Sequence, residues 1–274
     1  MIPLRIFLFY FLANCLTLTA DAQETISVDM NADWIRRDWK LCREAVQTSQ
    51  KNGTFAIHSN HAAALFWQVP TRAGSPLPID RNQDWIQRCE RPPRDFETTV
   101  KKMPGATDQL ISIADYPYIS WHWRVNATID DRGLANRYGE INKNSDDFAA
   151  KIGITFFNDK EELRELAYVW THSIPEETAL SQVTTVIPWV LKFKWYRIVA
   201  ETGDQKRNTW VFETRNLYQD FKRFYPDEEP REIVRIYLMS DSDNTGTEVQ
   251  SAFSNVNFYK TMPQGYVKTD THSN

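Results

Sequence analysis

Carboxylates that could act as acids, bases or ligands are concentrated in two short stretches. Asp146 and Asp147 directly precede an apolar run, and residues 241–246 have the sequence Asp-Ser-Asp-Asn-Thr-Gly. Neighbouring carboxylates form a general acid and base pair when their surroundings push their pKa values apart. Because adjacent strand residues point to opposite faces, Asp146 and Asp147 are not expected to be partners, and one of them is expected to cap the loop backbone. A hydrolase or lyase would instead combine Asp147, Glu213 and Asp241 across a sheet.

Residues 241–246 place oxygen ligands at alternate positions and end in a glycine, as a calcium loop requires. The twelfth position is Ala252, where an EF-hand has a bidentate glutamate, so this is not an EF-hand. Asp241 and Asp243 are candidate ligands for a structural calcium. The alternative is a turn in which these side chains and Asn244 accept hydrogen bonds from backbone N–H groups.

Basic and imidazole side chains occupy polar positions of several predicted strands. Arg215 alternates with Glu213, and it could pair with that carboxylate or clamp an anion in the bidentate way that guanidinium favours. His122 is either a ligand contact or an ordinary exposed histidine, and nothing decides the role of His172. If the outward basic positions share one sheet, we expect an anionic sugar polymer as ligand, whereas two separate faces would leave no patch. These positions are His122, Arg124, Lys151, Lys192, Lys194 and Arg215, together with Tyr237.

The candidate ligand-binding residues are His122, Arg124, Asp146, Asp147, His172, Glu213, Arg215, Asp241, Asp243 and Asn244.

The elements that would position these residues are mostly strands. Residues 118–125 alternate, with Trp121 and Trp123 predicted in the core and His122 and Arg124 on the other face. Residues 148–156 alternate in the same way, which predicts an outer surface of low relief that includes Lys151. Further strands are predicted at 166–172, 183–187, 189–200, 210–215, 233–240 and 252–259, with a short helix at 217–224. This pattern predicts a mainly β domain over residues 96–262, an antiparallel two-sheet sandwich of jelly-roll type.

The N-terminus predicts export. Arg5 precedes an apolar run over residues 6–18, and Ala20-Asp21-Ala22 offers a cleavage site, so residues 1–22 are predicted to be a signal peptide. About 13 apolar residues are too few to span a bilayer that needs roughly 20. A lipoprotein modified at Cys15 is the alternative. The expected location is periplasmic or extracellular, with no stable membrane span after cleavage.

Residues 23–95 predict a helical and irregular extension, with a helix that Asn31 or Asp33 caps and that contains Trp34. One helical turn is predicted at residues 85–89. Cys42 and Cys89 are expected to form a disulfide in an oxidising compartment, with two free thiols as the alternative. Residues 263–274 are expected to be a polar tail.

Composition excludes several classes of function. The formal net charge is −4 with mixed signs, which gives no electrostatic case for nucleic acid binding. The sequence contains no Gly-rich phosphate loop, no Gly-x-Ser-x-Gly elbow and no His-Glu-x-x-His helix, so no cofactor is expected beyond a possible structural calcium.

Six blocks in fixed order carry a resemblance to a known family. They are residues 119–125, 146–151, 168–170, 213–216, 220–223 and 241–246. Together they resemble an exported bacterial family catalogued as domain of unknown function 3047, over roughly residues 118–258. The resemblance implies an exported protein with a sandwich similar to carbohydrate-binding modules and no assigned activity. The N-terminal hundred residues lie outside the matched blocks.

Three functional hypotheses follow. The first is an exported, non-catalytic sandwich that binds a glycan or another cell-envelope component. The second is a glycan-active hydrolase or lyase that uses Asp147, Glu213 and Asp241 at the rim. The third is a structural envelope protein without a small ligand.

Overall fold

The computed structural model describes residues 25–38, 45–90, 92–93, 96–102, 105–136, 139–142, 146–187 and 191–263. The predicted signal peptide, the Cys15 lipidation site and Cys42 lie outside these residues, as does all but the first residue of the predicted tail. The signal peptide, the lipidation alternative and the Cys42–Cys89 disulfide therefore stay predictions. In the part of the chain that is described, no helix is long and apolar enough to cross a membrane.

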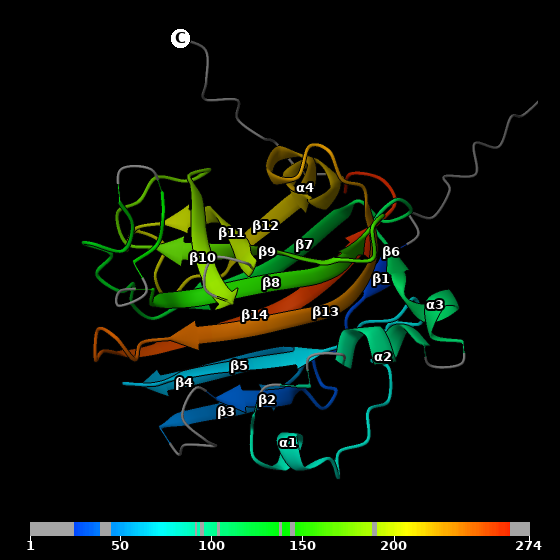
Figure 1. The fold of residues 1–274 in the computed structure, drawn as a ribbon. Helices are drawn as coiled ribbons and strands as arrows, with labels where there is room; N and C mark the ends of the chain where they lie inside the picture. The colour runs from blue at the N-terminus through cyan, green and yellow to red at the C-terminus, as the bar shows by residue number, and fades with distance from the viewer. Residues whose placement is uncertain are drawn as a thin grey trace, which may run out of the picture.

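Two β-sheets face each other, as the alternating pattern predicted (Figure 1). The first, which we call sheet A, contains β1 (Thr25–Ser27), β3 (Val46–Lys51), β4 (Thr54–Asn60), β7 (Tyr118–Val125), β12 (Val211–Asn216) and β14 (Glu248–Tyr259). Its strand order is β12-β7-β14-β4-β3, and β1 pairs with β14.

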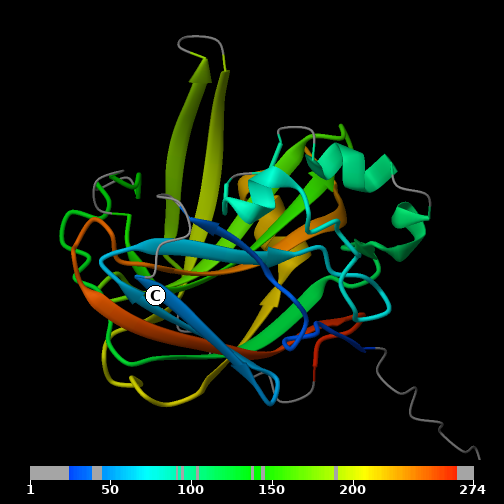
Figure 2. The same cartoon turned by 90° about the horizontal axis from the view of Figure 1, so that it is seen from below.

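Sheet B contains β2 (Ile35–Asp38), β5 (Ala63–Gln68), β6 (Ile111–Ser112), β8 (Phe148–Asn158), β9 (Leu163–Thr171), β10 (Ala179–Ile187), β11 (Leu191–Thr202) and β13 (Pro230–Asp241). Its order is β10-β11-β9-β8-β13-β5-β2, with β6 beside β13. The β9–β11 pair runs parallel, so sheet B is mixed. Figure 2 shows the β10–β11 hairpin projecting beyond the rest of the sandwich.

Aromatic side chains from both sheets fill the space between them. Trp121 and Trp123 have no exposed surface, as predicted. The Trp121 ring lies 5.1 Å from that of Tyr168, and the Trp123 ring lies 5.6 Å from that of Trp170. Each such ring removes about 150 to 250 Å² from water, so these pairs join β7 of sheet A to β9 of sheet B.

The outer surface predicted for residues 148–156 is wrong, because every residue of β8 is buried. Alternation does point Lys151 away from the other sheet, but that face of sheet B is covered. Its cover includes α2 (Phe96–Lys102), which contacts β13, and the segment around α3 (Ala106–Gln109) (Figure 1). Phe96 and Leu110 from this cover pack with Tyr237 and Met239 of sheet B.

The N-terminal helix predicted around Trp34 is also wrong. Residues 25–27 and 35–38 are strands, and Ile35 pairs with Trp67 of β5. Trp34 is buried beside Phe55 of β4, with their rings 5.5 Å apart, so pairing and burial override the helical spacing. The segment that precedes residue 96 thus supplies strands to both sheets. Its described helix, α1 (Asp84–Gln87), confirms the single turn predicted there.

The remaining strands predicted after residue 118 are confirmed, with boundaries that shift by a few residues. The helix α4 (Leu217–Phe224) begins and ends where its spacing predicted. The Asn216 side chain caps it by accepting a hydrogen bond from the Gln219 N–H at 3.0 Å.

Candidate functional site

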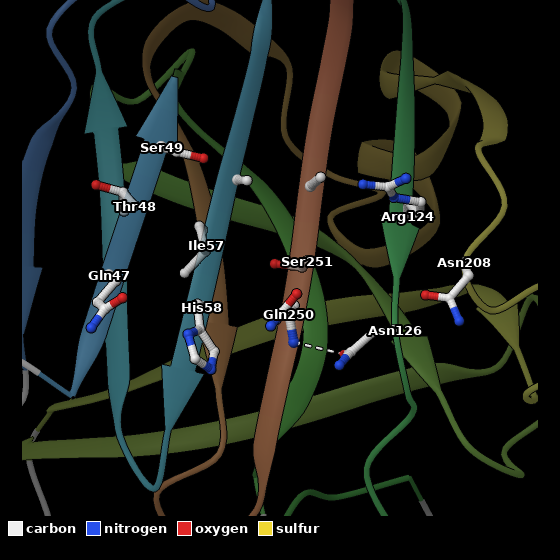
Figure 3. A pocket seen from close by; sticks show the side chains of 12 residues that line it. Gln47, Thr48, Ser49, Ile57, His58, Arg124, Asn126, Asn208, Gln250 and Ser251 are labelled. Atoms are coloured by element: carbon white, nitrogen blue, oxygen red, sulfur yellow. Dashed lines mark hydrogen bonds between the residues drawn. The ribbon is translucent and has the colours of Figure 1, made fainter. Parts of the chain in front are cut away.

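A groove of about 350 Å³ lies on the outer face of sheet A, the face that points away from sheet B (Figure 3). Strands β3, β4, β14 and β7 form it, together with the loop between β11 and β12. The lining residues are Gln47, Thr48, Ser49, Ala56, Ile57, His58, Arg124, Asn126, Asn208, Gln250, Ser251 and Ala252. Among the residues predicted as site residues, Arg124 belongs to this lining.

Strand register explains why this face is hollow. Ser49 pairs with Ala56, Ala56 with Ala252, and Ala252 with Arg124, so three small side chains follow one another across β3, β4 and β14. This row is the floor of the groove. Outward-facing residues on one strand are two positions apart, so each strand also contributes to a neighbouring row. The side chains of that row are longer than the small ones of the floor.

A polar wall flanks that floor. Gln47 pairs with His58, and His58 pairs with Gln250. Asn126 extends this row beyond the end of β7, where its Oδ1 accepts a hydrogen bond from the Gln250 N–H at 2.7 Å. Amide side chains provide donors and acceptors on one group, so this wall can bond hydroxyl groups in either direction.

The end of the groove at Arg124 carries exposed aromatic side chains. Trp210 is 42% exposed and Phe212 is 47% exposed. The Arg124 guanidinium lies 5.2 Å from the Trp210 ring centre, and the His122 ring lies 4.9 Å from that of Phe212. Burial lowers the pKa of His122, so its imidazole is neutral at pH 7.

A second cluster gathers several of the predicted acidic residues beside sheet B. Asp147 accepts hydrogen bonds from the Asn244 and Thr245 N–H groups at 3.2 and 2.7 Å, and from the Thr245 hydroxyl at 2.6 Å. The Asn244 amide also donates to Asp146 at 3.0 Å. Asp147 therefore caps the β13–β14 loop from the segment that precedes β8, which is the structural role expected for one of the two aspartates.

This cluster also holds carboxylates that could bind a metal ion. Asp147, Asp241 and Asp243 each offer an oxygen atom, and these atoms lie within 4.8 Å of one another. Burial raises the pKa of Asp241 well above its usual value, while burial and then Arg197 lower the pKa of Lys151 to about 8. Lys151 is thus a nearby counter-charge for Asp241, and calcium binding at Asp241 and Asp243 stays a prediction.

The comparisons with known proteins decide the family. The family model described as "Protein of unknown function (DUF3047)" matches residues 105–257, more than half of the chain. The chain belongs to this family. The matched segment contains β7 and most of β14 from the groove, whereas β3 and β4 precede it.

Solved structures that match the chain include a mutant of Xyn11A, an endo-1,4-β-xylanase and a carbohydrate-binding module. A loop-swap mutant of Xyn11A from Neocallimastix patriciarum is 11% identical with a TM-score of 0.34, over 85% of this chain and 96% of that one. A major endo-1,4-β-xylanase from Trichoderma reesei is 8% identical with a TM-score of 0.33, over 81% and 96%. A mutant of the family 29 carbohydrate-binding module CBM29-2 is 8% identical with a TM-score of 0.29, over 89% and 98%. No curated protein matches the chain.

Within this family member, the proposed catalytic set does not come together. Glu213 lies on β12 and accepts a hydrogen bond from Trp123 Nε1 at 3.3 Å, which directs it between the sheets. Burial and then Glu201 raise its pKa to about 8. Its charged neighbours are Glu201, Glu176 and Arg215, and not the Asp147 cluster.

The predicted ion pair of Glu213 with Arg215 is replaced by other partners. Arg215 is buried, pairs with Glu177, and donates from Nε to Asp220 Oδ2 at 3.0 Å. Tyr168 donates to the same Asp220 oxygen at 2.8 Å. Arg215 therefore has a structural ion pair, although with partners other than the predicted one.

The predicted basic patch is divided between several places. His122 and Arg124 share the outer face of sheet A, whereas Lys151 and Tyr237 lie on the covered face of sheet B. His172 is exposed, with its Nδ1 2.7 Å from the Thr128 hydroxyl. The side chains of Lys192 and Lys194 lie outside the description.

The predicted set did not include the polar wall or the aromatic end of the groove. Gln47, His58 and Gln250 are ordinary polar strand residues until the register aligns them. Trp210 and Phe212 had a signal that could have revealed them: Phe212 alternates with the inward-facing Val211 and Glu213, which predicts an aromatic side chain on the polar face.

Proposed function

We propose that this protein binds an oligosaccharide segment of a glycan in the groove on the outer face of sheet A, without catalysing its cleavage. The observation that carries the proposal is the groove itself. A floor of small residues lies between a wall of amide side chains and an end marked by an exposed tryptophan. Binding sites combine apolar contact area with a few well-placed polar groups in this way.

Each part of the groove suits one part of a sugar. The flat Trp210 ring offers an apolar face against which the C–H face of a sugar ring can pack. Gln47, Gln250 and Asn126 can exchange hydrogen bonds with ring hydroxyls. Neighbouring strands are about 4.8 Å apart, so the four strands from β3 to β7 span roughly 14 Å. That length fits a short chain of sugars better than a single one.

The groove supports binding more than hydrolysis. None of the described residues that line it is aspartate or glutamate. Glycoside hydrolysis uses a pair of carboxylates beside the scissile bond. Glu213, whose raised pKa would suit a general acid, hydrogen-bonds to Trp123 on the inner side of sheet A. The hydrolase or lyase hypothesis therefore ranks second.

Binding to a panel of soluble and insoluble polysaccharides tests the proposal, with released sugar measured in parallel. Trp210→Ala is expected to weaken binding at least tenfold, and Gln250→Ala is expected to weaken it less. Met262→Ala is the matched control, because Met262 is also a large exposed apolar side chain, at 39%, but it follows the end of β14, whereas Trp210 packs against the groove residue Arg124. Product release would favour the hydrolase, and absence of binding to every glycan would favour a structural envelope protein.

Export belongs to the same proposal. A glycan ligand of the cell envelope would be met outside the cytoplasm, in agreement with the predicted signal peptide. N-terminal sequencing of the protein recovered from the medium or the periplasm tests this. A mature N-terminus at Gln23 is the expected result, whereas an uncleaved Met1 in the cytoplasm would contradict it.

A further inference from the structure

We propose that the glycan is anionic, of the uronic acid class, and that Arg124 binds its carboxylate at the Trp210 end of the groove. This inference rests on the proposed function and adds the class of ligand to it.

Arg124 is placed to recognise an anion. It is exposed, and its guanidinium packs over the Trp210 ring at 5.2 Å. Stacking holds the planar fork against the ring, and a guanidinium held in this way can donate two parallel hydrogen bonds to a carboxylate. A sugar on Trp210 would bring its own carboxylate to this fork.

The surroundings leave this charge unbalanced. In the described ranges Arg124 takes part in no ion pair, whereas Arg164, Arg215 and Arg235 each pair with glutamate or aspartate. The described lining of the groove also contains no carboxylate, although Asp and Glu outnumber Lys and Arg by 36 to 32 in the whole chain. A positive charge without an acidic neighbour marks a place for an anionic ligand group.

The other titratable groups near the groove reinforce this polarity. Glu248 accepts a hydrogen bond from His58 Nε2 at 2.7 Å, on the side of the groove away from Arg124. Glu248 is four positions before Ala252, the partner of Arg124, so the two charges are separated by roughly 14 Å of strand. His122 is neutral at pH 7, so it adds no positive charge beside Arg124.

The experiment compares acidic polysaccharides with their own carboxyl-reduced forms, which keep the backbone and lose only the charge. Polygalacturonate, alginate and hyaluronan are the probes, and affinity is measured by calorimetry or affinity electrophoresis with the full mature chain. At least one acidic polymer is expected to bind about tenfold more tightly than its reduced form, because hydrogen bonds between charged groups are stronger than those between neutral groups. Arg124→Gln is expected to abolish that difference. Arg124→Lys keeps the charge but not the fork, and is expected to retain part of it.

The outcomes separate this inference from the function on which it rests. If acidic and reduced polymers bind equally to the wild-type protein, or if Arg124→Gln leaves the preference intact, the anionic assignment is overturned while glycan binding stands. Binding to neutral glycans alone leads to the same conclusion. If no polymer of either kind binds, both proposals fail.

Discussion

The outer faces of the two sheets follow the same alternating pattern, but one face is open and the other is covered. On sheet A, His58 and Arg124 point away from the core and line an open groove. On sheet B, Lys151 and Thr155 point away from the core as well, yet they are 4% and 1% exposed under helices and loops. Alternation decides which face a side chain joins, and the cover on that face decides whether a polar side chain is a ligand group or a structural group.

The covered face also has to satisfy its charges internally. Tyr237 donates to Glu165 at 2.8 Å, and Arg235 pairs with Glu97 at 3.1 Å. Asp241 Oδ1 is buried with no hydrogen-bond partner in the described structure, and its main counter-charge is Lys151. Buried charges that lose a partner are costly, so substitutions on this face should be far more damaging than those on sheet A.

The largest effect is expected from Gly153→Val on the covered face. A Cβ atom at position 153 would overlap the ring of Tyr237, which lies directly over this glycine. Because Tyr237 is itself buried and hydrogen-bonded to Glu165, it has little freedom to move. We expect a loss of about 3 kcal/mol in the free energy of unfolding, at the upper end of the usual cost of overpacking, measured by urea denaturation. A loss below about 1 kcal/mol would show that the cover is loosely packed.

Asp147→Ala is expected to have the next largest effect. The substitution removes the carboxylate that accepts hydrogen bonds from Asn244 and Thr245, and it leaves their N–H groups without this acceptor. We expect a loss of about 2 to 3 kcal/mol. Hydrogen exchange should accelerate at the amides of residues 244 and 245. Asp227→Ala, for which the structure gives no such contacts, is the control, and equal losses in the two variants would contradict the capping role.

Glu213→Gln tests whether Glu213, which lies between the two sheets, makes the stability of the protein depend on pH. The pKa of Glu213 is raised from 4.5 to about 8, so the folded state favours its protonated form. Its contribution to stability is fully present below about pH 4.5 and is lost as the pH rises to about 8. The glutamine variant should therefore lose less stability than the wild type over this window, by about 1 to 2 kcal/mol, because partial exposure screens the full shift. Parallel stability curves for the two proteins between pH 4.5 and 8 would contradict the assignment.

The sequence predicted what local pattern controls and not what distant segments decide together. Strand β7 and helix α4 were predicted to within a residue, because alternation and the spacing of Leu217, Phe221 and Phe224 are local signals. The N-terminal strands were not predicted, because Trp34 and Ile35 fit a helix until β4 and β5 pack against them.

The same limit applies to the site. The groove depends on the register of β4 with β14, which joins Ala56 to Ala252 and His58 to Gln250. No local pattern specifies a pairing between residues almost two hundred positions apart. The acidic cluster was found more readily, since Asp146, Asp147 and Asp241 stand out by type, but its composition could not show that Asp147 caps a loop.

Ala56→Trp is expected to have the smallest effect on stability. Set beside Gly153→Val, it compares the outer faces of sheet A and sheet B most directly. Both changes add bulk to the outer face of a central strand. Ala56 lies on the open floor of the groove, whose volume of about 350 Å³ accommodates an indole, and tryptophan is well tolerated in strands. We expect the free energy of unfolding to stay within about 0.5 kcal/mol of the wild type. Glycan binding should be lost, because the indole occupies the floor.

Ser49→Ala, on the same floor but without added bulk, should keep both stability and binding. If Ala56→Trp bound glycans as the wild type does, the ligand would lie elsewhere on the molecule, whereas a large loss of stability would mean that sheet A is covered as closely as sheet B.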